Sequence, residues 1–184
     1  SANMKIEPTE VYGCYVISLT EFADDRGSFS RSFCPIELRD AGVPYEFNIC
    51  QTNISQSTLR GTMRGMHWQA SPKPDGKIIR AVRGAMYDVA ADIRPDSPTY
   101  GKWTAQELSA ENHKAILIPP GCAHGIITLV DDTEFHYLMG EYYVPDLSRG
   151  MRWNDPMFNI EWPMEPIVID ERDATYPDFA PDGR

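Results

Sequence analysis

The sequence predicts an all-β protein with a sandwich or barrel architecture, because strand signals dominate the chain and helix signals are scarce. Runs of β-branched and aromatic residues recur at close spacing, with turn residues between them, as is typical of these folds. The predicted strands are Val11–Ser18, Phe29–Phe33, Phe47–Ile54, Lys77–Val82, Ala85–Asp92, Trp103–Leu108, His113–Ile118, Gly125–Leu129 and Thr133–Tyr143.

One short helix is expected near the N-terminus. The segment Pro35–Gly42 opens with proline and closes with glycine, the asymmetry typical of helix ends, and no second segment carries signals of comparable strength. From Tyr143 onward, repeated prolines separate short apolar pieces such as Met157–Trp162 and Pro166–Ile169. This change of character predicts an irregular C-terminal tail that packs over the barrel.

The length of 184 residues, without repeats or flexible linkers, fits one domain. We expect a single domain over residues 4–184. Ser1-Ala2-Asn3, which precede Met4, are interpreted as the remnant of an expression tag.

Charge and cysteine content exclude several classes of protein. The formal net charge of −10 argues against a nucleic-acid partner, since a phosphate-binding face is normally basic. No apolar run approaches the roughly 18 residues that indicate a membrane span. The four cysteines are widely separated and form no CxxC pair, which favours reduced thiols in a cytoplasmic protein.

Two carboxylates share one face of the predicted strand at residues 85–93. Alternation along this strand places Asp88 and Asp92 on the same side, which we expect to be polar. A solvated face, or salt bridges to Arg80 and Arg83, is the favoured interpretation. A catalytic role is the alternative.

The segment Arg60–Gln69 is the first candidate for a functional strand. Its glycines, placed among residues with β propensity, indicate a bulge or a close backbone approach. Arg64 and His67 are three residues apart and would face opposite sides of a regular strand. A bulge at Gly65 is expected to bring both side chains to one pocket. The alternative is an ordinary strand with a structural histidine.

Two short motifs resemble those of cupin β-barrels. Gly61 to His67 fits G-x5-H, and Pro119 to His124 fits P-x-G-x-x-H. Gln69 stands where a second metal-binding histidine would be, and no acid follows at the usual short distance. Two histidines alone fall short of ordinary zinc or iron coordination. We therefore expect no metal, and we interpret His67 and His124 as acid/base or hydrogen-bonding groups.

Further segments resemble the dTDP-4-dehydrorhamnose 3,5-epimerase family in the same order, from about Met4 to Phe179. They are Asp25–Phe29, Gln51–Ser55, Arg64–Gln69, Gly76-Lys77, Asp92–Gly101, Ile118–Gly125, Glu141–Tyr143 and Trp153–Asp155. The resemblance implies a metal-free, cupin-type jelly roll (a double-stranded β-helix). It also implies a homodimer that acts on a nucleotide-linked 4-keto-6-deoxy sugar without a cofactor.

The same resemblance implies roles for single residues. The base would be His67, paired with the carboxylate of Asp173, and the acid would be Tyr137. Lys77 and His124 match positions that line the sugar. The residues that match substrate-binding positions are Arg26, Gln51, Asn53 and Arg64.

Elementary chemistry agrees with these roles. A carbon acid next to a ketone needs a positioned base and a group that stabilises the enolate oxygen. His67 can accept the proton near neutral pH, and Lys77 supplies a fixed cation. Tyr137 can return a proton to the opposite face, which inverts the carbon. The chain has no glycine-rich dinucleotide-binding turn.

Each assignment has a structural alternative. Tyr137 could be packing in an aromatic strand, as we expect for Tyr142 and Tyr143. Lys77 could belong to a solvated basic stripe, and Asp173 could be a turn residue. The remaining histidines, His113 and His136, are expected at the surface without a chemical role.

Four departures from the family pattern lie at or near substrate-recognition positions. Arg31, Thr52 and Ser148 stand where the family usually has acids, and Arg172 replaces a usual lysine. We therefore expect a more positive pocket and a changed ligand, while the deprotonation chemistry is kept. A different nucleotide base, a heptose, or epimerisation at one carbon would each fit.

The sequence as a whole predicts an epimerase that deprotonates carbon next to a C4 ketone, in the manner of dTDP-4-dehydro-6-deoxyglucose 3,5-epimerases. A 3-epimerase or a 3,4-ketoisomerase on a related CDP-, GDP- or dTDP-linked sugar is the enzymatic alternative. A sugar-nucleotide-binding cupin without turnover is the other alternative.

Overall fold

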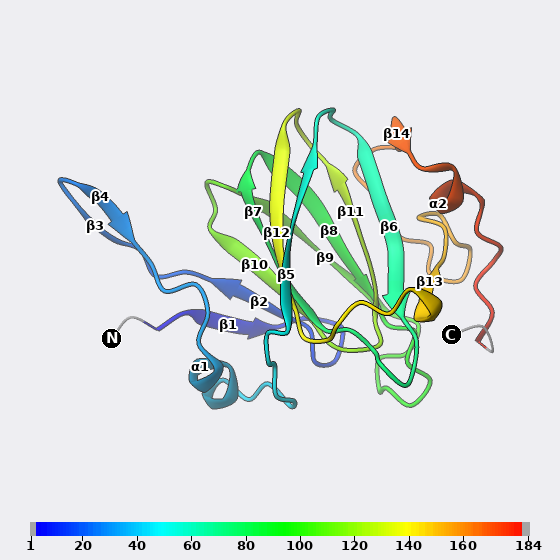
Figure 1. Ribbon diagram of the computed structural model, residues 1–184, viewed down its shortest axis with the longest axis horizontal. Helices are drawn as coiled ribbons and strands as arrows, with labels where there is room; N and C mark the ends of the chain where they lie inside the picture. The colour runs from blue at the N-terminus through cyan, green and yellow to red at the C-terminus, as the bar shows by residue number, and fades with distance from the viewer. Residues whose placement is uncertain (1–2, 182–184) are drawn as a thin grey trace.

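Two facing β-sheets make up most of the structure, a computed structural model that describes residues 3–181 (Figure 1). One sheet has the order β1 (Lys5–Pro8), β2 (Tyr15–Ser18), β10 (Lys114–Ile118), β7 (Lys77–Arg83), β12 (Thr133–Met139) and β5 (Gln51–Ser57). The other has the order β13 (Ser148–Gly150), β6 (Thr62–Gln69), β11 (Ala123–Thr128), β8 (Ala85–Ala91) and β9 (Trp103–Ser109), and β14 (Val168–Ile169) pairs in parallel with β6.

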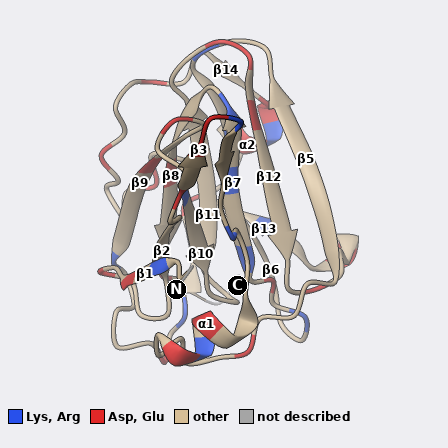
Figure 2. Cartoon of the chain, turned by 90° about the vertical axis from the view of Figure 1, so that its left-hand side faces the viewer, with Lys and Arg blue, Asp and Glu red and all other residues tan. Residues whose placement is uncertain are grey.

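The remaining elements lie outside these sheets. A separate hairpin of β3 (Phe22–Asp24) and β4 (Gly27–Phe29) projects away from the barrel (Figure 1), and its turn carries both acidic and basic residues (Figure 2). The helical elements are α1 (Pro35–Asp40), the 3-10 helix η1 (Pro145–Leu147) and α2 (Glu171–Thr175). Residues 1–2 of the predicted tag remnant and residues 182–184 of the predicted domain lie outside the described range.

The main core lies between the two sheets. Ile79 of β7, Ile116 of β10 and Phe135 of β12 pack from one side, and Met86 of β8 and Ile126 of β11 pack from the other. Alternate residues along each strand therefore point into a shared apolar layer, as in sandwiches and jelly rolls. The all-β, jelly-roll prediction is confirmed.

Most predicted strands overlap observed ones, and the predicted helix is confirmed at Pro35–Asp40. The prediction for Phe29–Phe33 is wrong beyond Phe29, because the chain leaves the hairpin there and runs unpaired to α1. The second helix, α2, was not expected. It has only five residues, too few to show a helical period.

The favoured interpretation of Asp88 and Asp92 as solvated residues, or as partners of Arg80 and Arg83, is wrong. Both carboxylates are fully buried. Strand β8 lies inside its sheet, between β11 and β9, with the core on one face and the C-terminal tail on the other. Alternation therefore separates two buried faces here.

The C-terminal tail packs over the second sheet, as predicted. Met151, Phe158 and Ile160 are buried in a cluster that also holds Val89 and Ala91 from the outer face of β8. The tail thus gives the sheet a second apolar layer. It also brings residues near position 173 to β6.

None of the helices within residues 3–181 is long and apolar enough to cross a membrane. The cysteines are free thiols, and Cys14 and Cys122 are buried. Burial raises the pKa of Cys14 to about 12, and it also raises the pKa of Cys122 well above its usual range.

Candidate active site

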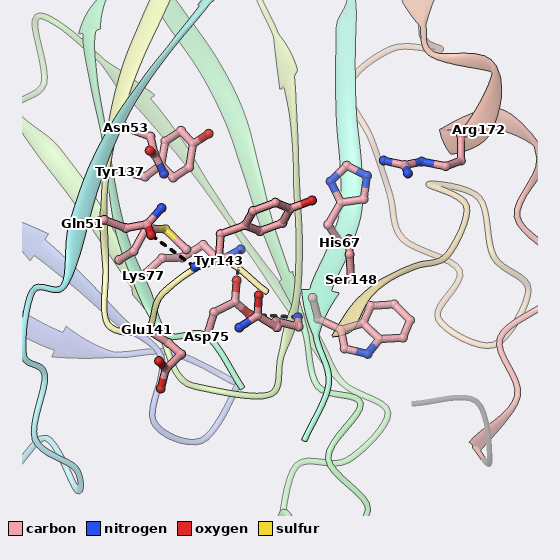
Figure 3. A pocket seen from close by; sticks show the side chains of 13 residues that line it. Gln51, Asn53, His67, Asp75, Lys77, Tyr137, Glu141, Tyr143, Ser148 and Arg172 are labelled. Atoms are coloured by element: carbon pink, nitrogen blue, oxygen red, sulfur yellow. Dashed lines mark hydrogen bonds and ion pairs between the residues drawn. The ribbon is translucent and has the colours of Figure 1, made fainter. Parts of the chain in front are cut away.

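A pocket of about 410 Å³ opens between β6 of one sheet and β5, β7 and β12 of the other (Figure 3). We call it the main pocket. Its lining residues are Gln51, Asn53, His67, Trp68, Gln69, Asp75, Lys77, Tyr137, Met139, Glu141, Tyr143, Ser148 and Arg172. A side pocket of about 250 Å³ is lined by Ser55, Arg64, His67, Lys77, His124, Ile126, Phe135 and Tyr137. His67, Lys77 and Tyr137 line both, so they mark the place where the two meet.

His67 forms a dyad with the carboxylate that the sequence analysis assigned to it. Its Nε2 lies 2.6 Å from Oδ1 of Asp173, and the other carboxylate oxygen accepts the backbone N–H of Gly65 at 3.2 Å. Burial acts to raise the pKa of Asp173, but the bonds to His67 and Gly65 outweigh it and lower that pKa. The carboxylate stays charged and orients the ring, which leaves Nδ1 to accept a proton.

The tail segment that follows Asp173 is anchored at two positions. Arg152 donates to the backbone carbonyl of Tyr176 at 2.9 Å, and the buried carboxylate of Asp155 accepts the N–H of Phe179 at 2.7 Å. The Tyr176 ring lies edge-on to His67, with ring centres 6.5 Å apart. These contacts fix the chain just after α2, so the position of the dyad does not depend on one hydrogen bond alone.

The predicted irregularity at Gly65 is present. His124 pairs with His67 and Gly125 pairs with Gly65, so Met66 is the extra residue in β6. Gly65 has φ +113°, and a Cβ there would come within 2.6 Å of the carbonyl oxygen of His124. Only glycine fits this conformation. The bulge turns Arg64 and His67 toward the same side pocket, as expected.

Tyr137 and His67 lie on opposite walls of the main pocket (Figure 3). Tyr137 comes from β12 and packs against Phe135, with ring centres 5.7 Å apart. Lys77, at the start of the neighbouring strand β7, lies between the two walls with its side chain only 9% exposed. A planar group held here would have a base on one side, a phenol on the other and a cation at its edge.

A second histidine–carboxylate pair adjoins the first. His124 of β11 lies opposite His67 across the strand pair, and its Nε2 is 2.8 Å from Oδ2 of Asp88. Burial raises the pKa of Asp88, although His124 and Lys77 act against this. Its Oδ1 is buried without a hydrogen-bond partner among the described residues. This pair faces the interior of the barrel, and His124 lines the side pocket.

Comparison with known proteins places this geometry in a family. The sequence model described as dTDP-4-dehydrorhamnose 3,5-epimerase matches residues 8–181. The chain belongs to this family. It is 39% identical to the dTDP-4-dehydrorhamnose 3,5-epimerase of Shigella flexneri over 170 residues, which are 92% of this chain and 93% of that protein. The predicted family is confirmed.

Solved structures agree. The dTDP-4-dehydrorhamnose 3,5-epimerase of Elizabethkingia anophelis superposes with a TM-score of 0.94 at 30% identity, over 99% of this chain and 100% of that one. A 3′-monoepimerase from Streptomyces bikiniensis, solved in complex with dTDP-quinovose, matches with a TM-score of 0.82 at 31% identity, over 91% and 84% of the two chains. The cupin-type jelly roll is thus the fold of the epimerase family.

Most residues that match family positions gather at the two pockets. Gln51 and Asn53 line the main pocket, while Arg64 reaches back to β5, where it donates to Ser57 at 3.1 Å. Arg26 and Arg31 line neither the main pocket nor the side pocket. Arg26 lies at the turn of the projecting hairpin, where it pairs with Asp24, and Arg31 pairs with Glu37 of α1.

The departures from the family pattern lie in different surroundings. Ser148 and Arg172 line the main pocket, and the Arg172 side chain points toward His67 (Figure 3). Thr52 is exposed, between Gln51 and Asn53 on the other side of β5. Arg172 replaces a lysine and so leaves the charge unchanged, whereas Ser148 stands where the family usually has an acid. Within this pocket the predicted change toward positive charge therefore depends on Ser148 alone.

Sequence reasoning missed two carboxylates and an aromatic ring in the main pocket. They are Asp75, Glu141 and Tyr143. Tyr143 was expected to be packing in a strand, but β12 ends at Met139 and Tyr143 is 64% exposed at the edge of the pocket. The position of Asp75 could have been predicted, because it lies two residues before Lys77 and residues two apart in an extended segment face the same side.

Gln69 occupies the position of the absent metal ligand, and its side chain joins loops. Its amide group donates to the carbonyls of Lys73 at 2.7 Å and Tyr142 at 3.0 Å, and its oxygen accepts the N–H of Val144 at 2.9 Å. The backbone of Tyr143 is therefore held on both sides. Within residues 3–181 no group of three or more His, Cys, Asp or Glu side chains could hold a metal ion.

Proposed function

We propose that this protein is a dTDP-4-dehydrorhamnose 3,5-epimerase that acts on a dTDP-linked 4-keto-6-deoxy sugar. The observation that carries the proposal is the placement of His67 and Tyr137 on opposite walls of one pocket, with Lys77 between them. Family membership over residues 8–181 supports the substrate class.

The proposed reaction starts with proton removal. His67 takes the proton from the carbon next to the ketone, and the electron pair of that C–H bond moves to the ketone oxygen as an enolate. The charged dyad partner Asp173 stabilises the imidazolium that forms. The Lys77 ammonium donates a hydrogen bond to the oxygen as its negative charge develops.

Reprotonation completes the inversion. The Tyr137 hydroxyl gives its proton to the same carbon from the opposite face, and the electron pair returns from oxygen to reform the ketone. Tyr137 is left as a phenolate and His67 as an imidazolium, so solvent must reset both groups before the next turnover. A proton from solvent thus replaces the original one at each epimerised carbon.

The remaining predicted residues would bind the substrate. Gln51, Asn53, Ser148 and Arg172 line the main pocket, and Arg64 and His124 line the side pocket. We assign them to the nucleotide, the diphosphate and the sugar hydroxyls without dividing them further. No cofactor takes part in the proposed reaction.

We also propose a homodimer. Phe22 and Phe29 of the projecting hairpin are 47% and 71% exposed, and an isolated two-stranded hairpin is marginally stable in water. Docking the hairpin on a second copy would bury both rings and carry Arg26 and Arg31 toward the pocket of that copy. Analytical ultracentrifugation of the protein and of Phe29→Asp tests this, since the variant should dissociate. We further propose a cytoplasmic protein with one domain over residues 4–184, and its free thiols support this location.

Solvent exchange tests the proposed reaction. Incubation with dTDP-4-dehydro-6-deoxyglucose in deuterated water should place deuterium at C3 and C5, which mass spectrometry and proton NMR can locate. Exchange at C3 alone would instead identify a 3-epimerase. The two activities need to be distinguished because the chain is also similar to a 3′-monoepimerase. Absence of exchange with this sugar and with CDP- and GDP-linked ketosugars would leave a binding protein without turnover.

A further inference from the structure

The main pocket contains an ion pair whose carboxylate, Asp75, has no role in the proposed reaction. Oδ2 of Asp75 lies 3.3 Å from Nζ of Lys77, and Figure 3 shows both side chains near Tyr143. The two side chains are only 11% and 9% exposed. This is a nearly buried pair, and its cation is the residue proposed to meet the enolate.

The carboxylate of Asp75 is fixed from the other side as well. Its Oδ1 accepts the backbone N–H of Gln69 at 2.9 Å. Gln69 ends strand β6, which carries the base His67, while Lys77 begins strand β7 of the opposite sheet. One carboxylate therefore bridges the strand of the proposed base and the strand of the proposed cation.

The loop that carries Asp75 has little freedom to move. The carbonyl of Gly76 accepts the N–H of Gly140 at 2.8 Å, and a Cβ at Gly76 would lie only 3.1 Å from the ring of Pro120. Glycine allows this close approach to the backbone. The Asp75 carboxylate is thus held in place before any substrate arrives, as an orienting group should be.

A lysine needs such a partner more than most side chains do. Its four-carbon stem is flexible, and ordering it costs conformational entropy at each turnover unless another contact has already ordered it. A buried ammonium without a partner is also costly. Asp75 meets both needs through one oxygen, and the ammonium keeps two further N–H donors for a ligand.

We propose that Asp75 is the positioning residue for Lys77 in this reaction, an assignment that rests on the proposed function. Asp75 acts through Lys77 and does not touch the reacting atoms. It holds the ammonium, charged, at the point where the ketone oxygen becomes an enolate. The pair therefore contributes to the transition state more than to ground-state binding.

The alternative is an ion pair that only ties the loop at residues 70–76 to the barrel. The two readings differ in what Asp75→Asn changes. Asparagine keeps an oxygen for the N–H of Gln69, so that hydrogen bond stays while the ion pair with Lys77 is lost. If the ion pair only stabilises the loop, Asp75→Asn should have lower thermal stability and an unchanged kcat. A positioning role predicts lower kcat with KM unchanged.

The experiment compares Asp75→Asn, Asp75→Glu and the wild-type enzyme, with deuterium exchange and full kinetics on the dTDP-linked ketosugar. A charged hydrogen bond lost only in the transition state corresponds to about a tenfold to 100-fold loss of kcat. We expect this loss in Asp75→Asn, with KM and dTDP affinity within about twofold of wild type. Asp75→Glu should recover part of kcat because it restores the charge.

A double-mutant cycle shows whether Asp75 acts through Lys77. In a Lys77→Met background, Asp75→Asn should cause no further loss of exchange rate, since the group it positions is gone. Asp92→Asn is the matched control. It removes a buried carboxylate from an ion pair with Arg94 outside the main pocket, so it should lower the melting temperature and leave kcat unchanged.

The outcomes separate this assignment from the proposed function. An inactive wild-type protein overturns the proposed function and this assignment together. An active wild type with an unaffected Asp75→Asn overturns the assignment alone. The same holds if Asp75→Asn reduces exchange in the Lys77→Met background by the factor that it shows in wild type.

Discussion

The two histidine–carboxylate pairs of this protein lie side by side and differ in their surroundings. His67 and His124 are opposite each other on paired strands, and each has a carboxylate within 2.8 Å. The His67 side chain is 38% exposed to the pockets, whereas the His124 side chain is 12% exposed. Equal pairing therefore does not mean an equal capacity to exchange protons with a ligand.

The carboxylates differ more than the histidines do. Hydrogen bonds to His67 and Gly65 keep the pKa of Asp173 low in spite of burial. Burial raises the pKa of Asp88, and one oxygen of that carboxyl group has no hydrogen-bond partner among the described residues. A charged carboxylate stabilises an imidazolium, and a carboxyl group that tends toward its neutral form does so less. The difference supports the proposed role of His67 as the base and favours a fixed hydrogen-bonding role for His124.

The largest expected effect comes from the exposed pair. His67→Ala removes the proposed base, so the rate of deuterium exchange should fall by at least about 100-fold, and by as much as about 10⁴-fold. Binding of dTDP, measured by calorimetry, should persist. His136→Ala is the matched control, since this exposed histidine of β12 lines neither pocket. Unchanged exchange in His67→Ala would remove the base from this pair.

Asp173→Asn tests the partner that orients the base. The side chain keeps its shape but loses the charge that stabilises the imidazolium, and a loss of exchange rate of about 100-fold is expected. Glu171→Gln, on the same helix, should have the wild-type rate. A normal rate in Asp173→Asn would show that the short contact to His67 has no catalytic consequence.

Asp88→Asn should have a smaller effect. Because the pKa of Asp88 is already raised by burial, replacing the carboxyl by a neutral amide changes the site less, and the exchange rate should stay within about tenfold of wild type. An equal loss of activity in Asp88→Asn and Asp173→Asn would contradict the conclusion that the two histidine–carboxylate pairs differ in function.

The smallest expected effect is on stability at acid pH. The pKa of Asp173 is lower in the folded protein than its ordinary value of 3.8, so the unfolded chain binds the proton more readily. The contribution of Asp173 to the free energy of unfolding is therefore complete above that ordinary value, and it is lost as the pH falls through the folded pKa. Urea unfolding from pH 6 to pH 3 should show a steeper loss for wild type than for Asp173→Asn. Parallel curves would contradict the low pKa.

Much of the barrel could be predicted because its strands follow local rules. Alternating residues, glycines and prolines mark the boundaries of β7 to β11 to within a few residues. Burial of both faces of β8 could not be predicted, since the layer over its outer face comes from a tail some 60 residues further along the chain. The apolar face with Val89 and Ala91 was therefore expected to be the core. Asp88, which faces the interior of the barrel, was expected on the exposed face.

The site shows the same division. His67 and the glycine before its bulge stand in one recognisable segment, but the contact of His67 with Asp173 spans 106 positions, and no periodicity predicts it. The family resemblance supplied that pairing. Asp75 and Gln69 were missed in their actual roles because each acts on another loop, and contacts between loops leave no period in the sequence.

Placing the carboxylate partner on the tail also affects the order in which the enzyme is completed during synthesis. Apart from the two-residue strand β14, the strands of the two main sheets end at Gly150, before the ribosome has added Asp173. A chain that stops between the two positions contains the barrel strands, the histidine and the lysine but has no group to orient the base. The proposed base and its orienting carboxylate are therefore both present only after the tail has been made.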